Sequence, residues 1–370
     1  MKLFVKSEVN TGRQFEFDLA KAIFIFKMIC VHCLEELFAP SAQAGSKIYQ
    51  FLVVQMNVVI GTAGVFMLCM GIGISYSRRN SSEQLISKGL KIFLMGYVLN
   101  FFRDVVPTLI AYFFGHFQFS FVIVLLLCAE IMQFAGLALM LFGFLKKHNL
   151  SDKAIFAISL AMSLVGSFAR FIDMGNYILN PIAGLFFGTV DSLYPDLAMG
   201  FFPLLNWFVF VVIGYLYGKL LRHCTDLNRY YKIVTPFSAV ILLFYAAIII
   251  PNHLNNMGSD IDFYYQMSTP YVFIQFFSFV FLTGLFHFLS KLFSSTAKKF
   301  IITMSANLNA TYCIHWVIIG WTEVAFIVFE FTHLKDTQVL LLGVLIFVVS
   351  TILAVIYKSI LQKRKQCVSR

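Results

Sequence analysis

The sequence predicts an all-α fold, a polytopic transmembrane helical bundle of about ten spans with the N- and C-termini in the cytosol. Three observations support this class: 59% of the 370 residues are hydrophobic and only 12% are charged, long apolar runs recur along the chain, and Lys and Arg gather on one side of these runs. A soluble protein carries about 25% charged residues, and about 20 apolar residues suffice for a helix to cross a bilayer. Because no hydrophilic stretch is long enough for a separate domain, residues 1–370 are expected to form a single integral-membrane domain.

The apolar runs set the order of the predicted helices. Hydropathy places the spans at residues 16–38, 51–76, 86–103, 120–145, 154–172, 201–221, 233–250, 271–290, 304–329 and 338–358. Prolines fall at or near the ends of these runs, as expected of a residue that lacks an N–H and clashes with the preceding helical turn. The stretch 105–119 is too short to span and is expected to form an interfacial or re-entrant helix.

The basic residues orient the predicted bundle. With the N-terminus in the cytosol, 22 of the 28 Lys and Arg residues fall in the inner segments, the asymmetry that sets membrane topology. The net charge of +10 is spread over six such segments, so it does not indicate a nucleic-acid partner. We expect a multi-pass protein of the plasma membrane whose partners include membrane lipids.

An ionisable stripe in the first span is the strongest functional signal. A charged side chain at membrane depth costs at least ~2.5–3.5 kcal/mol, so an ionisable group there usually serves a function. His32 follows Lys21 by eleven residues, which is three helical turns plus about 20° and roughly 16 Å along one face. Asp18 lies on the same face, and Glu35 and Glu36 follow His32 at the spacings from which either carboxylate reaches an imidazole. We therefore predict Asp18, Lys21, His32 and Glu35 as catalytic residues.

Further polar residues lie at membrane depth in later spans. The predicted substrate contacts are Glu130, Gln133, Asn206, Asn309 and His315. Hydrogen bonding between helices is a common use of such side chains and explains each of them singly. Taken together, they indicate a polar cavity that opens outward from the middle of the membrane.

Charged groups near the two membrane surfaces complete the candidate sites. Arg78, Arg79 and Lys88 flank the second and third spans on the inner side, where they fit either the phosphates of a cytosolic cofactor or anionic lipid headgroups. The outer loops 173–200 and 251–270 carry Asp and aromatic residues but no Lys or Arg. Such loops suit carbohydrate contact, and they equally suit solvated loops with interfacial aromatics.

Several of these motifs resemble those of known families. Asp18-x-x-Lys21 followed by His32 resembles the first-helix signature of the acyltransferase 3 family, where an Arg normally precedes the His at this spacing. Further stretches, at residues 66–75, 130–138, 202–207 with 214–218, and 312–316, are similar to the related heparan-α-glucosaminide N-acetyltransferase-type proteins and occur in family order. Lys21 departs from the family Arg, because Lys supplies the charge without a planar bidentate fork.

The resemblance implies transfer of an acyl group, commonly acetyl, from a cytosolic acyl-CoA to a hydroxyl or amine of an envelope glycan. It implies acetyl-CoA as donor substrate, a glycan acceptor as partner and no metal. His32 is then expected to act as general base or to carry the acyl group covalently. Glu35 or Glu36 orients it, and His315, Asn309 or Gln133 contacts the acceptor or the developing oxyanion.

Two other functions fit the same composition. In a transporter or flippase for a lipid-linked sugar, the buried ionisable residues form a proton or substrate pathway. Transporters often show internal repeats and helices broken at matching positions, and no convincing repeat is found in the sequence. A non-catalytic sensor or scaffold is the third hypothesis, although such a bundle does not need a polar stripe that reaches His32.

Overall fold

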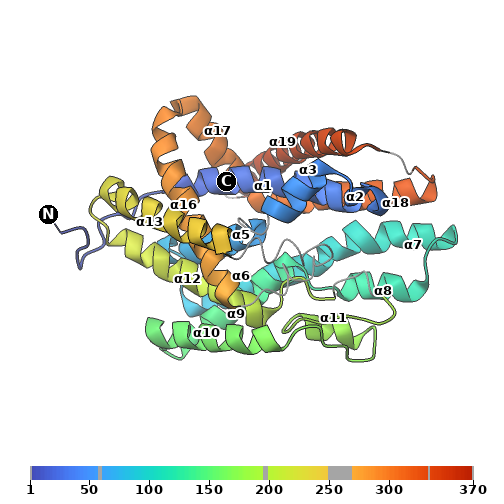
Figure 1. The fold of residues 1–370 in the computed structure, drawn as a ribbon, viewed down its shortest axis with the longest axis horizontal. Helices are drawn as coiled ribbons and strands as arrows, with labels where there is room; N and C mark the ends of the chain where they lie inside the picture. The colour runs from blue at the N-terminus through green and yellow to red at the C-terminus, as the bar shows by residue number, and fades with distance from the viewer. Residues whose placement is uncertain (1, 57–60, 195–198, 249–268, 332–333, 369–370) are drawn as a thin grey trace. The chain divides into compact units, whose positions relative to one another are not determined.

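The structure is a computed structural model that describes residues 2–56, 61–194, 199–248, 269–331 and 334–368 (Figure 1). Within these ranges every regular secondary-structure element is a helix, and the only β structure is three isolated β-bridges. The helices are α1 (Phe15–Glu36), α2 (Pro40–Gln43), α3 (Lys47–Tyr49), η1 (Gln50–Gln55), α5 (Thr62–Tyr76), α6 (Ser82–Asn100), η2 (Phe101–Val105), α7 (Val106–Phe113), α8 (Phe119–Leu127), α9 (Ile131–Lys147), α10 (Asp152–Phe168), α11 (Leu179–Gly184), α12 (Leu204–Arg222), α13 (Leu227–Ile248), α16 (Thr269–Leu289), η3 (Ser290–Leu292), α17 (Ser295–Ala306), α18 (Leu308–Val328) and α19 (Asp336–Val368). The predicted all-α class is confirmed.

The chain divides into two compact units. Unit 1 comprises residues 1–13, 59–101 and 120–285, and unit 2 comprises residues 14–58, 102–119 and 286–370. Each unit is built from segments that are distant in the sequence. The first helix therefore packs mainly with the last helices of the chain and contacts the nearby η1 less extensively.

In unit 1, α12 packs against α5, α9 and α10, and α6 packs along α9. Small residues let these backbones approach closely, as is usual between membrane helices. A Cβ at Gly71 of α5 would lie 2.0 Å from the carbonyl oxygen of Val211 in α12, and a Cβ at Gly214 would lie 2.2 Å from the carbonyl oxygen of Leu68. The α5–α12 contact is thus a backbone-to-backbone contact that larger residues would force apart.

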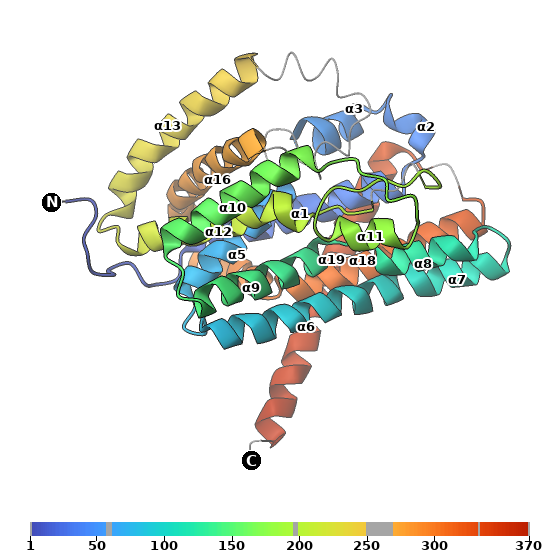
Figure 2. The ribbon, with the colours of Figure 1, turned by 90° about the horizontal axis from the view of Figure 1, so that it is seen from below.

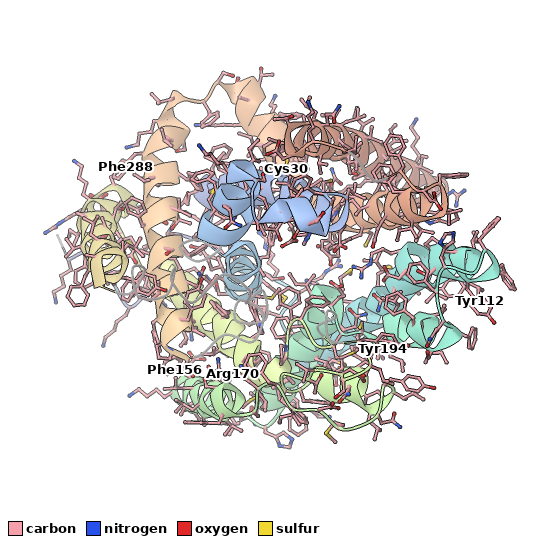
Figure 3. All side chains as sticks on the ribbon, turned by 45° about the vertical axis from the view of Figure 1, so that its right-hand side comes forward. Cys30, Tyr112, Phe156, Arg170, Tyr194 and Phe288 are labelled. Atoms are coloured by element: carbon pink, nitrogen blue, oxygen red, sulfur yellow. The ribbon has the colours of Figure 1, made fainter. Side chains whose placement is uncertain are left out.

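In unit 2, α1 packs against α17, α18 and α19, and α18 packs against α7 and α19. The α1–α19 contact includes the edge-to-face pair of Phe26 and Phe347. It also brings Gly343 of α19 against Cys30 of α1, which Figure 3 labels. This packing holds α1, the helix that carries Asp18, Lys21, His32 and Glu35, against the C-terminal helices of the chain.

Among the described residues, six helices are long and apolar enough to cross a membrane. They are Ser82–Phe113, Leu204–Arg222, Leu227–Ala247, Thr269–Leu292, Leu308–Val328 and Asp336–Arg364. The chain is therefore an integral membrane protein by helix length and composition. Helix α1 has 22 residues and is long enough to span, but it carries more charge than these six.

Two predicted spans are interrupted. The span predicted at 51–76 breaks at Gly61, whose extended backbone precedes the 15-residue helix α5. The span predicted at 120–145 divides into α8 and α9, because the residues around Ala129 leave the helix and form a bridge with Gly200. The amide of Asn100 donates to the carbonyl of Cys128 at 2.8 Å and so satisfies the end of α8.

The third span is longer than expected. The prediction that it ends near residue 103 is wrong, because the helix continues through the π-turn η2 into α7 and reaches Phe113 (Figure 2). The stretch predicted as a separate interfacial or re-entrant helix thus contains the continuation of this helix. The predicted outer loop 251–270 lies almost wholly outside the described residues.

Candidate functional site

Helix α1 positions the predicted catalytic residues in unit 2. Glu16 and Asp18 lie in its first turn, where carboxylates are favoured by the helix dipole. Glu35 and Glu36 lie in its last turn, where the dipole disfavours carboxylates. Helix formation therefore does not explain why α1 ends in two carboxylates. A hydrogen-bond donor or a cation is needed to stabilise their charge.

His32 is that donor for Glu35. Its Nδ1 lies 3.0 Å from Oε2 of Glu35, and the two side chains are 15% and 13% exposed. A carboxylate only accepts hydrogen bonds, so Nδ1 carries the proton and donates. In the neutral ring the lone pair then resides on Nε2. The arrangement is that of a base whose tautomer and orientation are fixed by a carboxylate.

A second histidine lies beside the first. The rings of His32 and His315 stack with centroids 6.0 Å apart and planes 14° apart. His315 is fully buried, and its Nδ1 lies 3.1 Å from the carbonyl oxygen of Thr311, one turn earlier in α18. Because that carbonyl only accepts, Nδ1 donates, and in the neutral ring Nε2 is again the acceptor. Nε2 has no hydrogen-bond partner among the described residues.

Trp316 packs directly against His32. Its ring centroid lies 4.2 Å from that of His32, and the guanidinium of Arg103 lies 4.3 Å from the indole centroid. Arg103 also donates from Nε to the carboxylate of Asp104 at 2.7 and 2.8 Å. A cation over an indole face is a stabilising contact, and it is stronger when both groups are desolvated. We refer to His32, Glu35, Arg103, His315 and Trp316 as the His32 cluster.

Two features of α18 bring η2 into this cluster. A Cβ at Gly320 would lie 2.3 Å from the carbonyl oxygen of Arg103, so a side chain at this position would separate the helices. Trp321 donates from Nε1 to the carbonyl of Phe102 at 3.0 Å. Gly320 and Trp321 lie less than two turns after Trp316 on α18. Their contacts with η2 therefore hold Arg103 close to Trp316.

Further carboxylates surround the cluster. Glu323 interacts electrostatically with Glu36, Asp104 and Arg103. Burial, together with Glu35 and Glu36, raises the pKa of Tyr49 to about 12. Tyr49 therefore stays protonated at physiological pH and remains a possible hydrogen-bond donor beside the acidic end of α1.

Asp18 and Lys21 form a second polar group on α1. Asp18 is buried and accepts from the hydroxyl of Ser305 at 2.5 Å and from Lys21 Nζ at 3.5 Å. Along α1, Lys21 lies eleven residues from His32, which is roughly 16 Å. The structure thus separates the predicted catalytic residues into two groups at different heights along α1.

Comparison with protein families was made for the whole chain. The family model of heparan-alpha-glucosaminide N-acetyltransferase, catalytic, matches residues 13–248. The chain belongs to this family. No curated protein and no solved structure matches it.

The match to the heparan-alpha-glucosaminide N-acetyltransferase catalytic family ends before α16. His32, Glu35 and Arg103 lie within the matched region, whereas His315 and Trp316 lie beyond it. The family suggests a membrane acetyltransferase whose relatives use acetyl-CoA as donor in general. Among the residues that the structure describes, no group of three or more His, Cys, Asp and Glu is placed to hold a metal ion.

The other predicted substrate contacts lie elsewhere. Glu130 and Gln133 belong to unit 1, where the backbone N–H of Glu130 donates to the side chain of Gln133 at 3.2 Å and caps α9. Asn206 is fully buried at the start of α12 and lies against Gly166. Asn309 is exposed in the first turn of α18. Since His315 follows it by six residues, Asn309 lies about 120° away around the helix and outside the His32 cluster.

The predicted cofactor-binding residues share one end of unit 1. Arg78 and Arg79 are exposed in the turn between α5 and α6, and Lys88 is exposed early in α6. Lys146 donates to the carbonyl of Asn80 in the same turn at 3.2 Å. The structure therefore keeps these basic groups together and accessible.

Sequence reasoning missed Arg103 and Trp316 as members of the cluster. Both carried a signal: Arg103 is a cation at the end of an apolar run, and Trp316 directly follows His315. What the sequence does not contain is the pairing of η2 with α18, which brings these two side chains together.

Proposed function

We propose that this protein is a membrane acetyltransferase that moves an acetyl group from cytosolic acetyl-CoA to a hydroxyl or amine of an extracytoplasmic glycan. Residues 1–370 act as one catalytic domain. The family match supports the reaction class. The proposal for the chemistry rests on one observation, the contact between His32 Nδ1 and Glu35 Oε2 at 3.0 Å.

This contact suits general-base catalysis. Nε2 of His32 takes the proton from the acceptor hydroxyl or amine as its oxygen or nitrogen attacks the thioester carbonyl carbon. The tetrahedral intermediate then collapses, the C–S bond breaks, and the CoA thiolate takes the proton from the imidazolium. The Glu35 carboxylate stabilises that imidazolium and keeps the ring in the productive tautomer.

The remaining candidate residues have supporting roles in this proposal. His315 accepts a hydrogen bond from the acceptor through Nε2, and Glu130, Gln133, Asn206 and Asn309 contact substrate. Arg78, Arg79 and Lys88 bind the CoA phosphates. Asp18 and Lys21 lie on the face of α1 along which the donor reaches His32.

The proposal includes a topology. Ten spans with both termini in the cytosol place Arg78, Arg79 and Lys88 on the side where acetyl-CoA is made, and the His32 cluster nearer the outside. The distribution of Lys and Arg supports this orientation. The plasma membrane is the location that gives such an enzyme access to an envelope glycan.

Mass spectrometry of envelope glycans from cells with and without the gene tests the proposal. We expect one glycan to lose a mass of one acetyl group when the gene is absent, and to regain it when the wild-type gene, but not His32→Ala, is restored. Glycans that keep their acetyl groups but change in amount or location on the gene's removal would contradict acetyl transfer and support a transporter or flippase.

A further inference from the structure

Two buried aromatic ring nitrogens of α18 in the His32 cluster have no hydrogen-bond partner among the described residues. They are Nε2 of His315 and Nε1 of Trp316, on adjacent residues of α18. Buried polar atoms are nearly always hydrogen-bonded in native proteins, so an orphaned pair beside a catalytic base indicates a ligand contact.

The two atoms differ in hydrogen-bonding character. In the neutral ring of His315, Nε2 accepts, because Nδ1 donates to the carbonyl of Thr311. The indole Nε1 of Trp316 only donates. His315 therefore suits a group that donates, such as the acceptor hydroxyl or amine, and Trp316 suits a group that accepts, such as a carbonyl oxygen.

Trp316 is held where the reaction occurs. Its ring centroid lies 4.2 Å from that of His32 and 5.4 Å from that of His315. The Arg103 cation lies against its face at 4.3 Å. A positive charge against the π-system withdraws electron density from the indole, which makes the N–H a stronger donor to a developing anion.

We propose that Trp316 is a further catalytic residue, whose indole N–H donates a hydrogen bond to the thioester carbonyl oxygen and stabilises the oxyanion formed on attack. This inference rests on the proposed function. As the nucleophile bonds to the carbonyl carbon, the carbonyl π electrons move to oxygen, and Trp316 donates to that oxygen without giving up its proton. On collapse the C=O bond re-forms and the thiolate leaves. A single oxyanion donor typically contributes about 10²–10³-fold to kcat.

The test measures release of the CoA thiol from acetyl-CoA by the full-length protein in nanodiscs, with an α-glucosaminide or the glycan fraction from cells that lack the gene as acceptor. Trp316→Phe removes the N–H and keeps an aromatic ring against His32. We expect kcat to fall about 10²–10³-fold while KM for acetyl-CoA changes less than about threefold. The matched control is Trp207→Phe, which also removes an indole N–H from a buried tryptophan, but from α12 and outside the His32 cluster.

A second variant separates the N–H from the packing of the ring. Benzothienylalanine at position 316 replaces the N–H by sulfur and keeps the bicyclic shape, and we expect it to lose activity as Trp316→Phe does. Full activity of the benzothienylalanine protein would overturn the oxyanion role, whatever Trp316→Phe does. Activity of Trp316→Phe equal to that of Trp207→Phe would overturn it as well and leave the proposed function standing. Absence of thiol release by the wild-type protein with every acceptor would overturn both.

Discussion

One hydrogen bond at His32 decides which ring nitrogen is available for chemistry. Because Nδ1 donates to Glu35 at 3.0 Å, the lone pair on Nε2 is free to take a proton, and the carboxylate is placed to stabilise the charge that results. His315 is oriented in the same way, because its Nδ1 donates to the backbone carbonyl of Thr311 rather than to a carboxylate. The negative charge of Glu35 therefore distinguishes His32, the proposed base, from His315.

Removing that charge tests the assignment. We expect Glu35→Gln to lower kcat by about 10²–10⁴-fold, since the imidazolium loses its counter-charge while the side chain keeps its size. Thiol release from acetyl-CoA gives the rate. Glu36→Gln is the control, because Glu36 is the adjacent carboxylate and is exposed. Equal rates for the two variants would contradict the orienting role of Glu35.

The sequence predicted the residues of α1 better than it predicted their partners. His32 and Glu35 were predictable because helical spacing alone brings i and i+3 together. The contact of His32 with His315 and Trp316 joins residues nearly 300 positions apart, and hydropathy contains no information on which spans pack together. Glu130 and Gln133 also form a helix cap at the start of α9, which a hydropathy profile does not reveal.

At the scale of elements, the α5–α12 contact depends on the absence of a side chain. We expect Gly71→Ala to lower the thermal midpoint of the purified protein, because its Cβ would lie 2.0 Å from the carbonyl oxygen of Val211, and such overpacking costs typically ~1–3 kcal/mol. Gly73→Ala is the control on the same helix, where a Cβ meets nothing within 4 Å. Intrinsic tryptophan fluorescence on heating compares the two variants. A midpoint for Gly71→Ala equal to that of Gly73→Ala would contradict the close approach.

We expect the loop between α10 and α12 to respond to pH through Asp173. Hydrogen bonds from Ser192, Asn180 and the backbone of Gly175 lower the pKa of Asp173 to about 2. A lowered folded-state pKa stabilises the loop above the ordinary value near 3.8, and this contribution is lost as the pH falls towards 2. We expect hydrogen exchange of residues 173–193 to accelerate between about pH 4 and pH 2, beyond the intrinsic pH dependence. Asp173→Asn should remove this step; an unchanged step in that variant would contradict its assignment to Asp173.

The breaks in the helices were harder to predict than the helices. The run at 120–145 is apolar apart from Ser120, Glu130 and Gln133, yet it divides into α8 and α9, where the amide of Asn100 satisfies the carbonyl groups at the end of α8. The run that was expected to end at 103 continues to Phe113, although Arg103 and Asp104 interrupt its hydropathy. Arg103 and Asp104 form an ion pair, and this pairing allows the helix to continue through two charged residues.

At the scale of the whole molecule, the proposed topology places the two ends of the chain in the cytosol. Single cysteines at Gly12 and Asn176 test it, with native Cys367 as the reporter near the C-terminus. We expect a membrane-impermeant maleimide to label Asn176→Cys in intact cells, and Gly12→Cys and Cys367 only after permeabilisation. Labelling of Gly12→Cys in intact cells would contradict the orientation. Cys224 gives little background, because burial of its side chain raises the pKa of the thiol and the thiolate is the reactive form.

The central claim is that His32 is the base of a membrane acetyltransferase. The most direct measurement is the turnover number for thiol release from acetyl-CoA by purified full-length wild-type, His32→Gln and His116→Gln proteins, with the glycan fraction as acceptor. His116 is exposed after α7 and serves as the matched histidine control. We predict that His116→Gln retains the wild-type rate and that His32→Gln loses at least about 10²-fold while its thermal midpoint is kept. A folded His32→Gln protein that turns over at the wild-type rate would contradict the account.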